Sequence, residues 1–233
     1  MTYEEGCSSY FRNNVEVGDI CIDIGAHYGE YTFLFSGLVG KEGKVFAFEP
    51  FKTSCNVIKN RIIEEGYKNI VVEQKAIWSQ SLSGKLYSSG EDTSDCRVFE
   101  KILSCDLVKP SNGWILNKEI LDCDLISLDD YFGEDIPKCE FMKIDSQGSE
   151  LRIFKGMQRF LEKQSKINII MECCDFLLKE KGDSAIELGN YLLKNGFSIQ
   201  IILDPNHSFI PKSEILRDIY GLIDKEFHIY AWR

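Results

Sequence analysis

The chain has 233 residues, of which 44% are hydrophobic and 27% charged, and its formal net charge is −10 at pH 7. This length and composition are typical of one globular domain and exclude a disordered or fibrous protein. An acidic chain without a long Lys/Arg cluster repels phosphate backbones, so nucleic acid is a poor candidate partner.

The apolar runs are too short to cross a membrane. The longest of them, such as 167–171 and 199–203, fall far below the roughly 20 residues that a membrane span needs. The acidic N-terminus does not read as a secretory signal, so we expect a cytoplasmic location without membrane partners. The nine cysteines form no C-x-x-C pair, and we expect reduced thiols that mostly serve as small core residues.

Apolar, β-branched runs alternate with longer amphipathic stretches, which is the pattern of a parallel sheet covered by helices on both faces. The predicted strands are 20–24, 44–48, 70–74, 141–145, 167–172, 198–203 and 227–232, with a short extra strand at 85–88. The predicted helices are about 29–38, 54–65, 149–161 and 184–194. These elements indicate a single doubly wound α/β domain over residues 1–233.

One segment, Ser89 to Cys123, breaks the alternation and is too long for a simple connection in a compact domain. Its apolar residues, among them Val98, Phe99 and Trp114, argue against plain disorder. We interpret it as a lid or substrate-recognition insertion. The alternative is a structural excursion packed on the edge of the sheet.

The segment Asp23 to Gly29 lies between the first strand and the first helix, where a glycine turn lets a ligand approach backbone N–H groups. A dinucleotide fingerprint requires G-x-G-x-x-G, whereas here the glycines are Gly25 and Gly29. Pyrophosphate binding is therefore disfavoured. The carboxylate of Asp23 suits a cationic amino group or a bound water, as in the amino-acid portion of S-adenosylmethionine.

Glu49 ends the second strand about 24 residues after Gly25, the spacing at which an acidic side chain accepts hydrogen bonds from ribose hydroxyls. Pro50 then stiffens the turn. Ile77 and Trp78 follow the third strand and are candidates to flank an adenine ring. Core packing is the alternative for both, and it is favoured for Trp78.

Five blocks of the chain resemble the FkbM family of methyltransferases. They are 21–32, 45–50, 125–132, 142–156 and 169–172, in the family's order, and Lys143-Ile-Asp-Ser-Gln-Gly-Ser-Glu150 is the most specific. His27 departs from the family's usual Asn, although both residues tolerate a left-handed backbone. A second departure is Ser146-Gln147, where the family usually carries Val-Glu.

The resemblance implies a class I, Rossmann-like methyltransferase fold whose seven-stranded sheet is mostly parallel with an antiparallel last strand. It also implies S-adenosylmethionine as cofactor and O-methylation of a hydroxyl on a sugar, glycan or secondary metabolite. The residues expected to bind the cofactor are Asp23, Gly25, Ala26, His27, Gly29, Thr32, Glu49, Pro50, Ile77 and Trp78.

An alcohol is a poor nucleophile at neutral pH, so the acceptor needs a base or a metal ion beside its hydroxyl. Asp145 and Glu172 end adjacent strands and open onto one crevice, so we expect Asp145 to orient or deprotonate the acceptor with Glu172 as its partner. Glu150 has a supporting role. The alternative is that Asp145 and Glu150 cap the following helix.

Two further features bear on the chemistry. The two carboxylates of Asp145 and Glu172 also suit Mg²⁺, although a base without metal is favoured. His207, in a turn after the sixth strand, is a candidate base, while a surface or packing role is favoured for each of the three histidines.

Two other functions remain open from the residues alone. A dinucleotide-dependent oxidoreductase uses the same kind of sheet, but the missing middle glycine argues against it. A non-catalytic nucleoside-binding module keeps Asp23 and Glu49, but Asp145 and Glu172 argue modestly against it. The sequence does not predict the oligomeric state.

Overall fold

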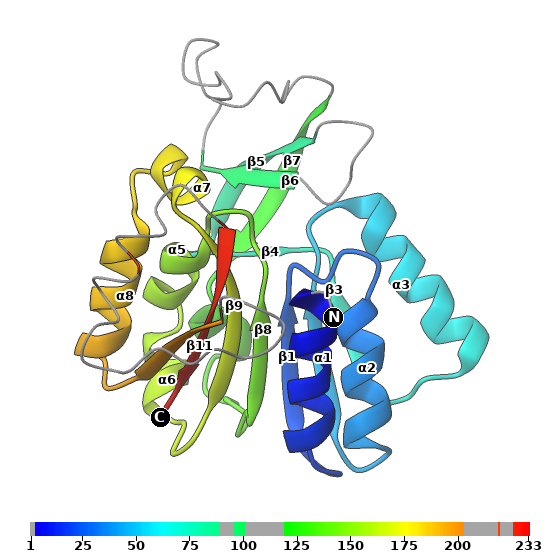
Figure 1. Ribbon diagram of the computed structural model, residues 1–233. Coiled ribbons are helices and arrows are strands. Elements are labelled where there is room, and N and C mark those ends of the chain that lie inside the picture. The colour runs from blue at the N-terminus through cyan, green and yellow to red at the C-terminus, as the bar shows by residue number, and fades with distance from the viewer. Residues whose placement is uncertain (1–2, 89–95, 101–118, 203–218, 220–225) are drawn as a thin grey trace.

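The computed structural model describes residues 3–88, 96–100, 119–202, 219 and 226–233, and these residues form two β-sheets with helices on both faces of the larger one (Figure 1). The larger sheet has seven strands in the order β10-β11-β9-β8-β1-β2-β3. Its strands are β1 Ile20–Ile24, β2 Lys44–Phe48, β3 Ile70–Glu73, β8 Phe141–Ile144, β9 Asn168–Cys174, β10 Ser198–Ile202 and β11 Glu226–Trp232.

Only β11 runs against its neighbours, pairing antiparallel with both β9 and β10, while the other pairs of this sheet are parallel. The predicted seven-stranded, mostly parallel sheet with an antiparallel last strand is therefore confirmed. Because parallel strands all end at the same edge, the residues that follow β1, β2, β8 and β9 meet there.

The helices divide between the two faces of this sheet. The helices are α1 Tyr3–Asn14, α2 Glu30–Val39, α3 Lys52–Glu65, α4 Leu128–Phe132, α5 Glu150–Lys155, α6 Gln158–Glu162, α7 Asp175–Glu180 and α8 Ala185–Lys194. Within β1, Cys21 packs in a cluster with Phe11 of α1 and Phe35 of α2. Its neighbour Ile22 packs on the opposite face in a cluster with Phe154 of α5. This alternation buries β1 on both faces, as expected of a central strand.

The helix predicted over 149–161 is two helices, α5 and α6, separated at Gly156 and Met157. The reason is a close approach between backbones, since a Cβ atom on Gly156 would lie 2.0 Å from the carbonyl oxygen of Trp78. The helices α1, α4 and α7 were not predicted.

The second sheet lies beyond the carboxyl ends of the main strands, at the top of Figure 1. It consists of β4 Ala76–Ile77, β5 Leu82–Ser88, β6 Cys96–Phe99 and β7 Glu119–Ile126, in the order β4-β7-β5-β6. The predicted short strand 85–88 is part of β5. Of the predicted insertion 89–123, the described portions are 96–100, which contains β6, and 119–123, which begins β7, and the remainder lies outside the described residues.

The described part of the chain bears on two expectations from the composition. No helix there combines the length and hydropathy required to span a bilayer. Most of the cysteines there are buried, as predicted for small core residues, and Cys21, Cys55 and Cys139 are fully enclosed.

We predict that Gly156→Ala lowers the free energy of unfolding by about 1 to 3 kcal/mol, because the added methyl group overlaps the Trp78 carbonyl. The matched control is Gly37→Ala, within α2, where no atom lies within 4 Å of the added Cβ. There the same substitution raises the free energy of unfolding by about 0.5 to 1 kcal/mol. Urea unfolding followed by circular dichroism measures both. Equal stabilities for the two variants would contradict the packing.

Candidate functional site

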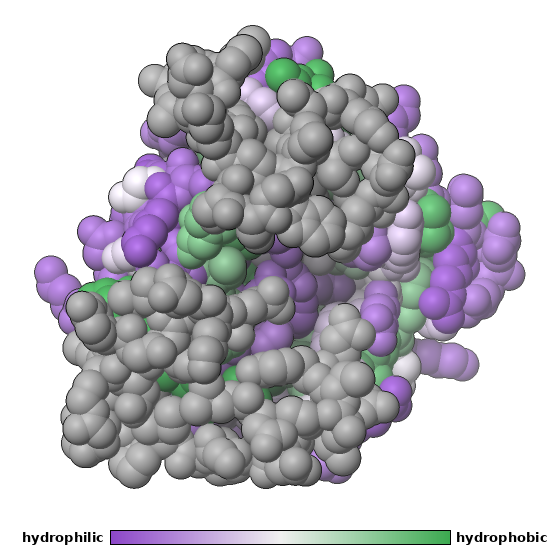
Figure 2. Space-filling model, turned by 45° about the horizontal axis from the view of Figure 1, so that its top comes forward, coloured by the Kyte–Doolittle hydropathy of each residue, from purple (hydrophilic) through white to green (hydrophobic). Residues whose placement is uncertain are grey.

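A cavity of about 640 Å³ opens at the carboxyl edge of the main sheet, beneath the second sheet. Its volume lies within the range of small-molecule and cofactor sites. In Figure 2, hydrophilic surface lines a hollow near the middle of the view. The lining residues are Asp23, Ile24, Gly25, Ala26, His27, Tyr28, Glu30, Tyr31, Phe48, Glu49, Pro50, Lys75, Ala76, Ile77, Cys96, Val98, Lys143, Asp145, Ser146, Gln147, Ser149 and Glu172.

The turn between β1 and α2 forms one wall of this cavity. Gly25, His27 and Gly29 all adopt positive φ angles, of 78°, 49° and 87°. Gly25 cannot be replaced without movement, because its Cβ would lie 1.7 Å from the carbonyl oxygen of Asp145. His27 takes the left-handed conformation that was expected to be tolerated. The turn thus holds its backbone close to β8 and open to the cavity.

Asp23 stands at the base of this turn and is only 1% exposed. Its Oδ2 accepts a hydrogen bond of 2.6 Å from the hydroxyl of Thr32. Burial raises the pKa of Asp23, although Lys143 and Thr32 oppose the increase. Gly29 and Thr32 shape the turn from outside the cavity lining. Thr32 therefore acts on the site through Asp23.

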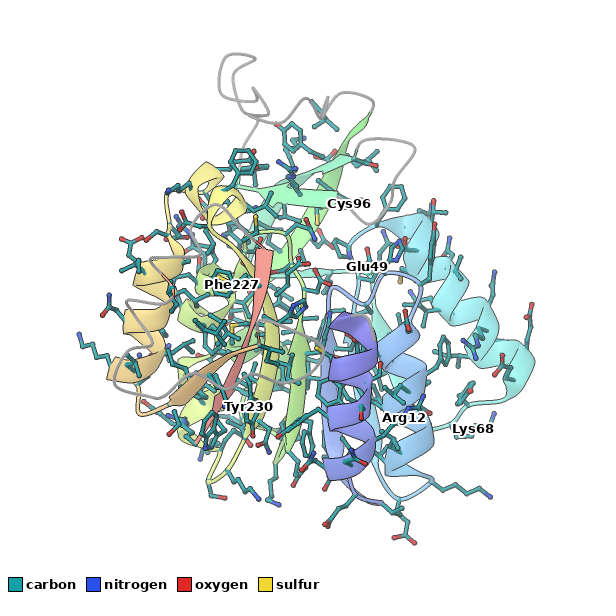
Figure 3. All side chains as sticks on the ribbon, viewed as in Figure 1. Arg12, Glu49, Lys68, Cys96, Phe227 and Tyr230 are labelled. Atoms are coloured by element: carbon teal, nitrogen blue, oxygen red, sulfur yellow. The ribbon has the colours of Figure 1, made fainter. Side chains whose placement is uncertain are left out.

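Glu49 joins the two turns that follow β1 and β2 (Figure 3). Its Oε2 accepts the backbone N–H of His27 at 2.7 Å, and its Oε1 accepts that of Phe51 at 2.8 Å. Burial raises the pKa of Glu49 to about 7, against the effect of these two amides. Pro50 follows Glu49 in the turn after β2 and lines the cavity.

Lys143 is a buried residue of the cavity lining that was not predicted from the sequence. It lies opposite Asp23 in the pairing of β1 with β8, and it is 4% exposed. Its Nζ donates to Asp145 Oδ2 at 3.0 Å and lies 4.7 Å from the ring centroid of Tyr31. Burial alone would lower the pKa of Lys143, but the charges of Asp145 and Asp23 outweigh it and raise the value. Its signal in the sequence was a charged residue inside an otherwise apolar strand.

The predicted partners Asp145 and Glu172 do come together. The amide of Gln147 donates to Asp145 Oδ1 at 3.3 Å and to Glu172 Oε2 at 3.0 Å, so it bridges the two carboxyl groups. Burial acts to raise the pKa of Asp145, but the charge of Lys143 and a hydrogen bond with Glu172 prevail and lower it. Asp145 is therefore held as a carboxylate.

Glu150 does not line the cavity. Its Oε1 accepts hydrogen bonds from the Ser146 hydroxyl at 2.8 Å and from the Gly148 amide at 3.2 Å, so it organises the loop that precedes α5. This matches the helix-start alternative for Glu150. Asp145 instead faces Lys143 and Gln147, and the side chain of Ser149, at the N-cap of α5, makes no capping hydrogen bond.

The other predicted site residues differ in where the structure places them. Ile77 lines the cavity, whereas Trp78 packs in the core of the second sheet and donates its Nε1–H to Glu100 at 2.9 Å. The core alternative for Trp78 therefore matches its position. His207 lies outside the described residues. His228 is 9% exposed in β11, and burial lowers its pKa to about 4.

Further lining residues come from the second sheet. Cys96 and Val98 of β6 and Lys75 beside β4 border the cavity, and no signal in the sequence placed them there. Within the described ranges, no three His, Cys, Asp or Glu side chains are grouped as metal ligands would be.

The fold is similar to solved methyltransferases. A methyltransferase FkbM from Methylobacillus flagellatus superposes with a TM-score of 0.54 at 16% identity, covering 97% of this chain and 50% of that one. The chain thus spans half the length of that protein. A protein from Streptococcus mutans, assigned as a methyltransferase and solved with SAH, has a TM-score of 0.53 at 10% identity, covering 100% and 98%.

A third similar fold is that of a precorrin-6y C5,15-methyltransferase from Geobacter metallireducens, with a TM-score of 0.50 at 13% identity, covering 98% of this chain and 87% of that one. No curated protein matches the chain. Residues 23–199, more than half of the chain, match the Methyltransferase FkbM domain. The chain therefore belongs to the FkbM family of S-adenosylmethionine-dependent methyltransferases.

Proposed function

We propose that this methyltransferase acts on a hydroxyl oxygen of a sugar, glycan or other small metabolite. The observation that carries the proposal is the carboxyl pair of Asp145 and Glu172, which lines the same cavity as the β1–α2 turn and Glu49. When bound, S-adenosylmethionine supplies an electrophilic methyl group on a sulfonium. The pair would then face the acceptor.

The residues of the cavity fit this cofactor. Each oxygen of Glu49 uses one acceptor position for a backbone amide, so each keeps capacity for a ribose hydroxyl. Gly25 presents backbone without a Cβ atom, which permits close approach of a ligand. Asp23 supplies a carboxylate for the amino group of the methionine portion, and Ile77 supplies an apolar surface for the adenine.

The carboxyl pair provides a means to orient the acceptor and hold its proton. Asp145, kept ionised by Lys143, is a good hydrogen-bond acceptor for a hydroxyl but a weak base by itself. Its hydrogen bond with Glu172 couples the titrations of the two carboxyl groups, so the pair as a unit, and not Asp145 alone, sets how readily a proton from the acceptor hydroxyl is held. Lys143 already donates a hydrogen bond to one oxygen of Asp145, so a magnesium ion would have to compete with Lys143 for that oxygen. We therefore favour a mechanism in which the carboxyl pair acts without a metal ion.

The insertion 89–123 remains our candidate for acceptor recognition. Its strand β6 contributes Cys96 and Val98 to the cavity wall, on the side facing the edge of the main sheet. Figure 3 places Cys96 above Glu49, with the cavity lined by both. Acceptor identity would then depend on β6, and the cofactor on the turns after β1 and β2.

We predict that incubation with S-adenosylmethionine adds the mass of one methyl group to a hydroxylated member of a panel of glycans and natural products. Asp145→Asn should lower the rate at least about 100-fold, because the isosteric amide cannot hold the proton. Binding of S-adenosylhomocysteine should change less than about threefold, and NAD should not bind. Mass spectrometry and calorimetry measure these.

The control for Asp145→Asn is Asp122→Asn, at a side chain that is 83% exposed on β7. It should leave turnover unchanged. Turnover in Asp145→Asn near the level of the control would overturn the role of the pair, and methylation at nitrogen or carbon alone would overturn the hydroxyl acceptor.

We predict that S-adenosylhomocysteine binds about tenfold more weakly at pH 6 than at pH 8. The pKa of Glu49 is raised to about 7, so below that pH the carboxyl holds a proton, which must leave before the ribose hydroxyls can donate to it. Affinity is therefore lost as the pH falls through 7. Glu49→Gln should bind weakly with no such dependence. Calorimetry at both pH values measures these affinities. If the affinity of Glu49→Gln changed with pH as much as that of the original protein, the assignment of Glu49 to the ribose would be contradicted.

A further inference from the structure

The short helix α7 contacts two parts of the site that are far apart in the sequence, the strand β6 and the loop 146–149. Gly148 of this loop lies against α7 so closely that a Cβ atom on it would be 2.4 Å from the backbone of Leu177. Glu172, on β9, precedes α7 by only a few residues. The helix is therefore placed between the second sheet and the carboxyl pair.

The contact between α7 and β6 is an ion pair in a protected place. Arg97 Nη1 lies 2.8 Å from each carboxylate oxygen of Glu180. The side chain of Arg97 is 5% exposed and that of Glu180 is 14% exposed. Since water is largely excluded, this pair is screened far less than a surface salt bridge and has a defined geometry.

Lys181 follows α7 and makes contacts in both directions. Its Nζ lies 4.9 Å from the ring centroid of Phe99, the last residue of β6. The same ammonium group donates a hydrogen bond of 2.6 Å to the backbone carbonyl of Gln147. One cation thus connects the second sheet with the loop that follows β8.

Gln147 adopts a left-handed backbone conformation, with φ of 50°, which is uncommon for a residue other than glycine. In that conformation its side-chain amide reaches Asp145 and Glu172, at 3.3 Å and 3.0 Å. Such a conformation persists only where the surrounding contacts hold it. The hydrogen bond from Lys181 is a direct contact to this peptide.

We propose that Lys181 is a positioning residue that holds Gln147 in place, so that the amide of Gln147 bridges Asp145 and Glu172 while β6 is fixed above them. The proposal rests on the proposed function only in assigning that pair to the acceptor. Because β6 also contributes Cys96 and Val98 to the cavity wall, Lys181 keeps the acceptor wall and the carboxyl pair in one arrangement.

Several charged or titratable groups face the pair and influence the pH at which it titrates. They are Lys143 on β8, Asp23 on β1, Tyr31 on α2 and His228 on β11. None of these is altered by a substitution at position 181, although Lys181→Met also removes the charge of Lys181, which Gln147→Leu keeps. The amide of Gln147 donates to both carboxyl groups and so favours their deprotonated forms, and its loss should move the titration of the pair to higher pH.

The experiment follows the carboxyl carbons of Asp145 and Glu172 by NMR during a pH titration, with the signals assigned from Asp145→Asn and Glu172→Gln. Lys181→Met should raise the titration midpoint of the pair by about 0.5 to 1 pH unit, which corresponds to loss of one hydrogen bond. Gln147→Leu should give a similar shift, and the double variant no more than either. Lys181→Arg should restore the original midpoint.

The matched control is Lys194→Met, an exposed lysine at the end of α8, which should leave the titration unchanged. Binding of S-adenosylhomocysteine within about threefold of the original protein checks that each variant is folded. If Lys181→Met fails this check, Phe99→Leu removes the ring beneath the ammonium and should shift the midpoint in the same direction.

An unchanged midpoint in folded Lys181→Met, or additive shifts in the double variant, would overturn the proposal. These outcomes are independent of the methylation panel. If no hydroxyl acceptor is methylated but the midpoint responds to Lys181, the coupling holds and the proposed function fails.

Discussion

The carboxyl edge of the main sheet depends on one buried cation, Lys143. A lysine inside a protein costs several kcal/mol unless carboxylates compensate for the lost water, and here Asp23 and Asp145 do so from the neighbouring strand and the strand's own end. The ring of Tyr31 covers the ammonium group. Removal of one partner from such a group typically costs about 3 to 5 kcal/mol. The charged groups of Asp23, Lys143 and Asp145 are therefore fixed by the strands of the main sheet and by their contacts with one another.

This arrangement explains how two acidic residues stay close in a protected cavity. Asp23 and Asp145 belong to adjacent strands, and without Lys143 the repulsion between them would favour protonation of one. With Lys143 present, Asp145 remains ionised and Glu172 completes the pair. Glu49 adds a second fixed point, since its two oxygens hold the turns after β1 and β2 through their amides. The cavity is preorganised by these contacts before any ligand enters.

The two halves of the cavity differ in what positions them. The half proposed for the cofactor is built from the ends of β1 and β2, and the family match from residue 23 to 199 includes both ends. The other half is bordered by β6 of the second sheet, which α7 joins to the loop 146–149 through Arg97, Glu180 and Lys181. In a common fold, such an added sheet is where differences in acceptor can arise while the cofactor site is retained.

The sequence predicted the parts of this structure that depend on local pattern. The strands β1, β2 and β8 are short apolar runs bounded by turn residues, and the turn 23–29 follows from its glycines. The second sheet was not predicted, because β5, β6 and β7 pair across segments whose register no local signal encodes. The helix α7 was not predicted because it follows β9 directly. No glycine or proline between Glu172 and Lys181 marks where the strand ends and the helix begins.

The residues of the site likewise divide into those that local sequence pattern predicts and those that depend on the pairing of distant strands. Asp23, Glu49, Asp145 and Glu172 were predicted because each lies at or near the carboxyl end of a strand at the same edge of the sheet. To predict Lys143 one would need to know which residue lies opposite Asp23 in the sheet. To predict Cys96 and Val98 one would need the fold of the second sheet. Trp78 was a candidate to flank the adenine because it follows β3, with core packing favoured, and it lies after the short strand β4 in the core of the second sheet.

The central claim is that one cavity holds the cofactor at the ends of β1 and β2 and presents its sulfur to the Asp145 and Glu172 pair. A crystal structure of the protein with S-adenosylhomocysteine tests it most directly. The account predicts ribose hydroxyls hydrogen-bonded to Glu49 and the sulfur on the side of the cavity that Asp145 and Glu172 line. A ligand bound outside this cavity, or one whose sulfur points away from that pair, would contradict it.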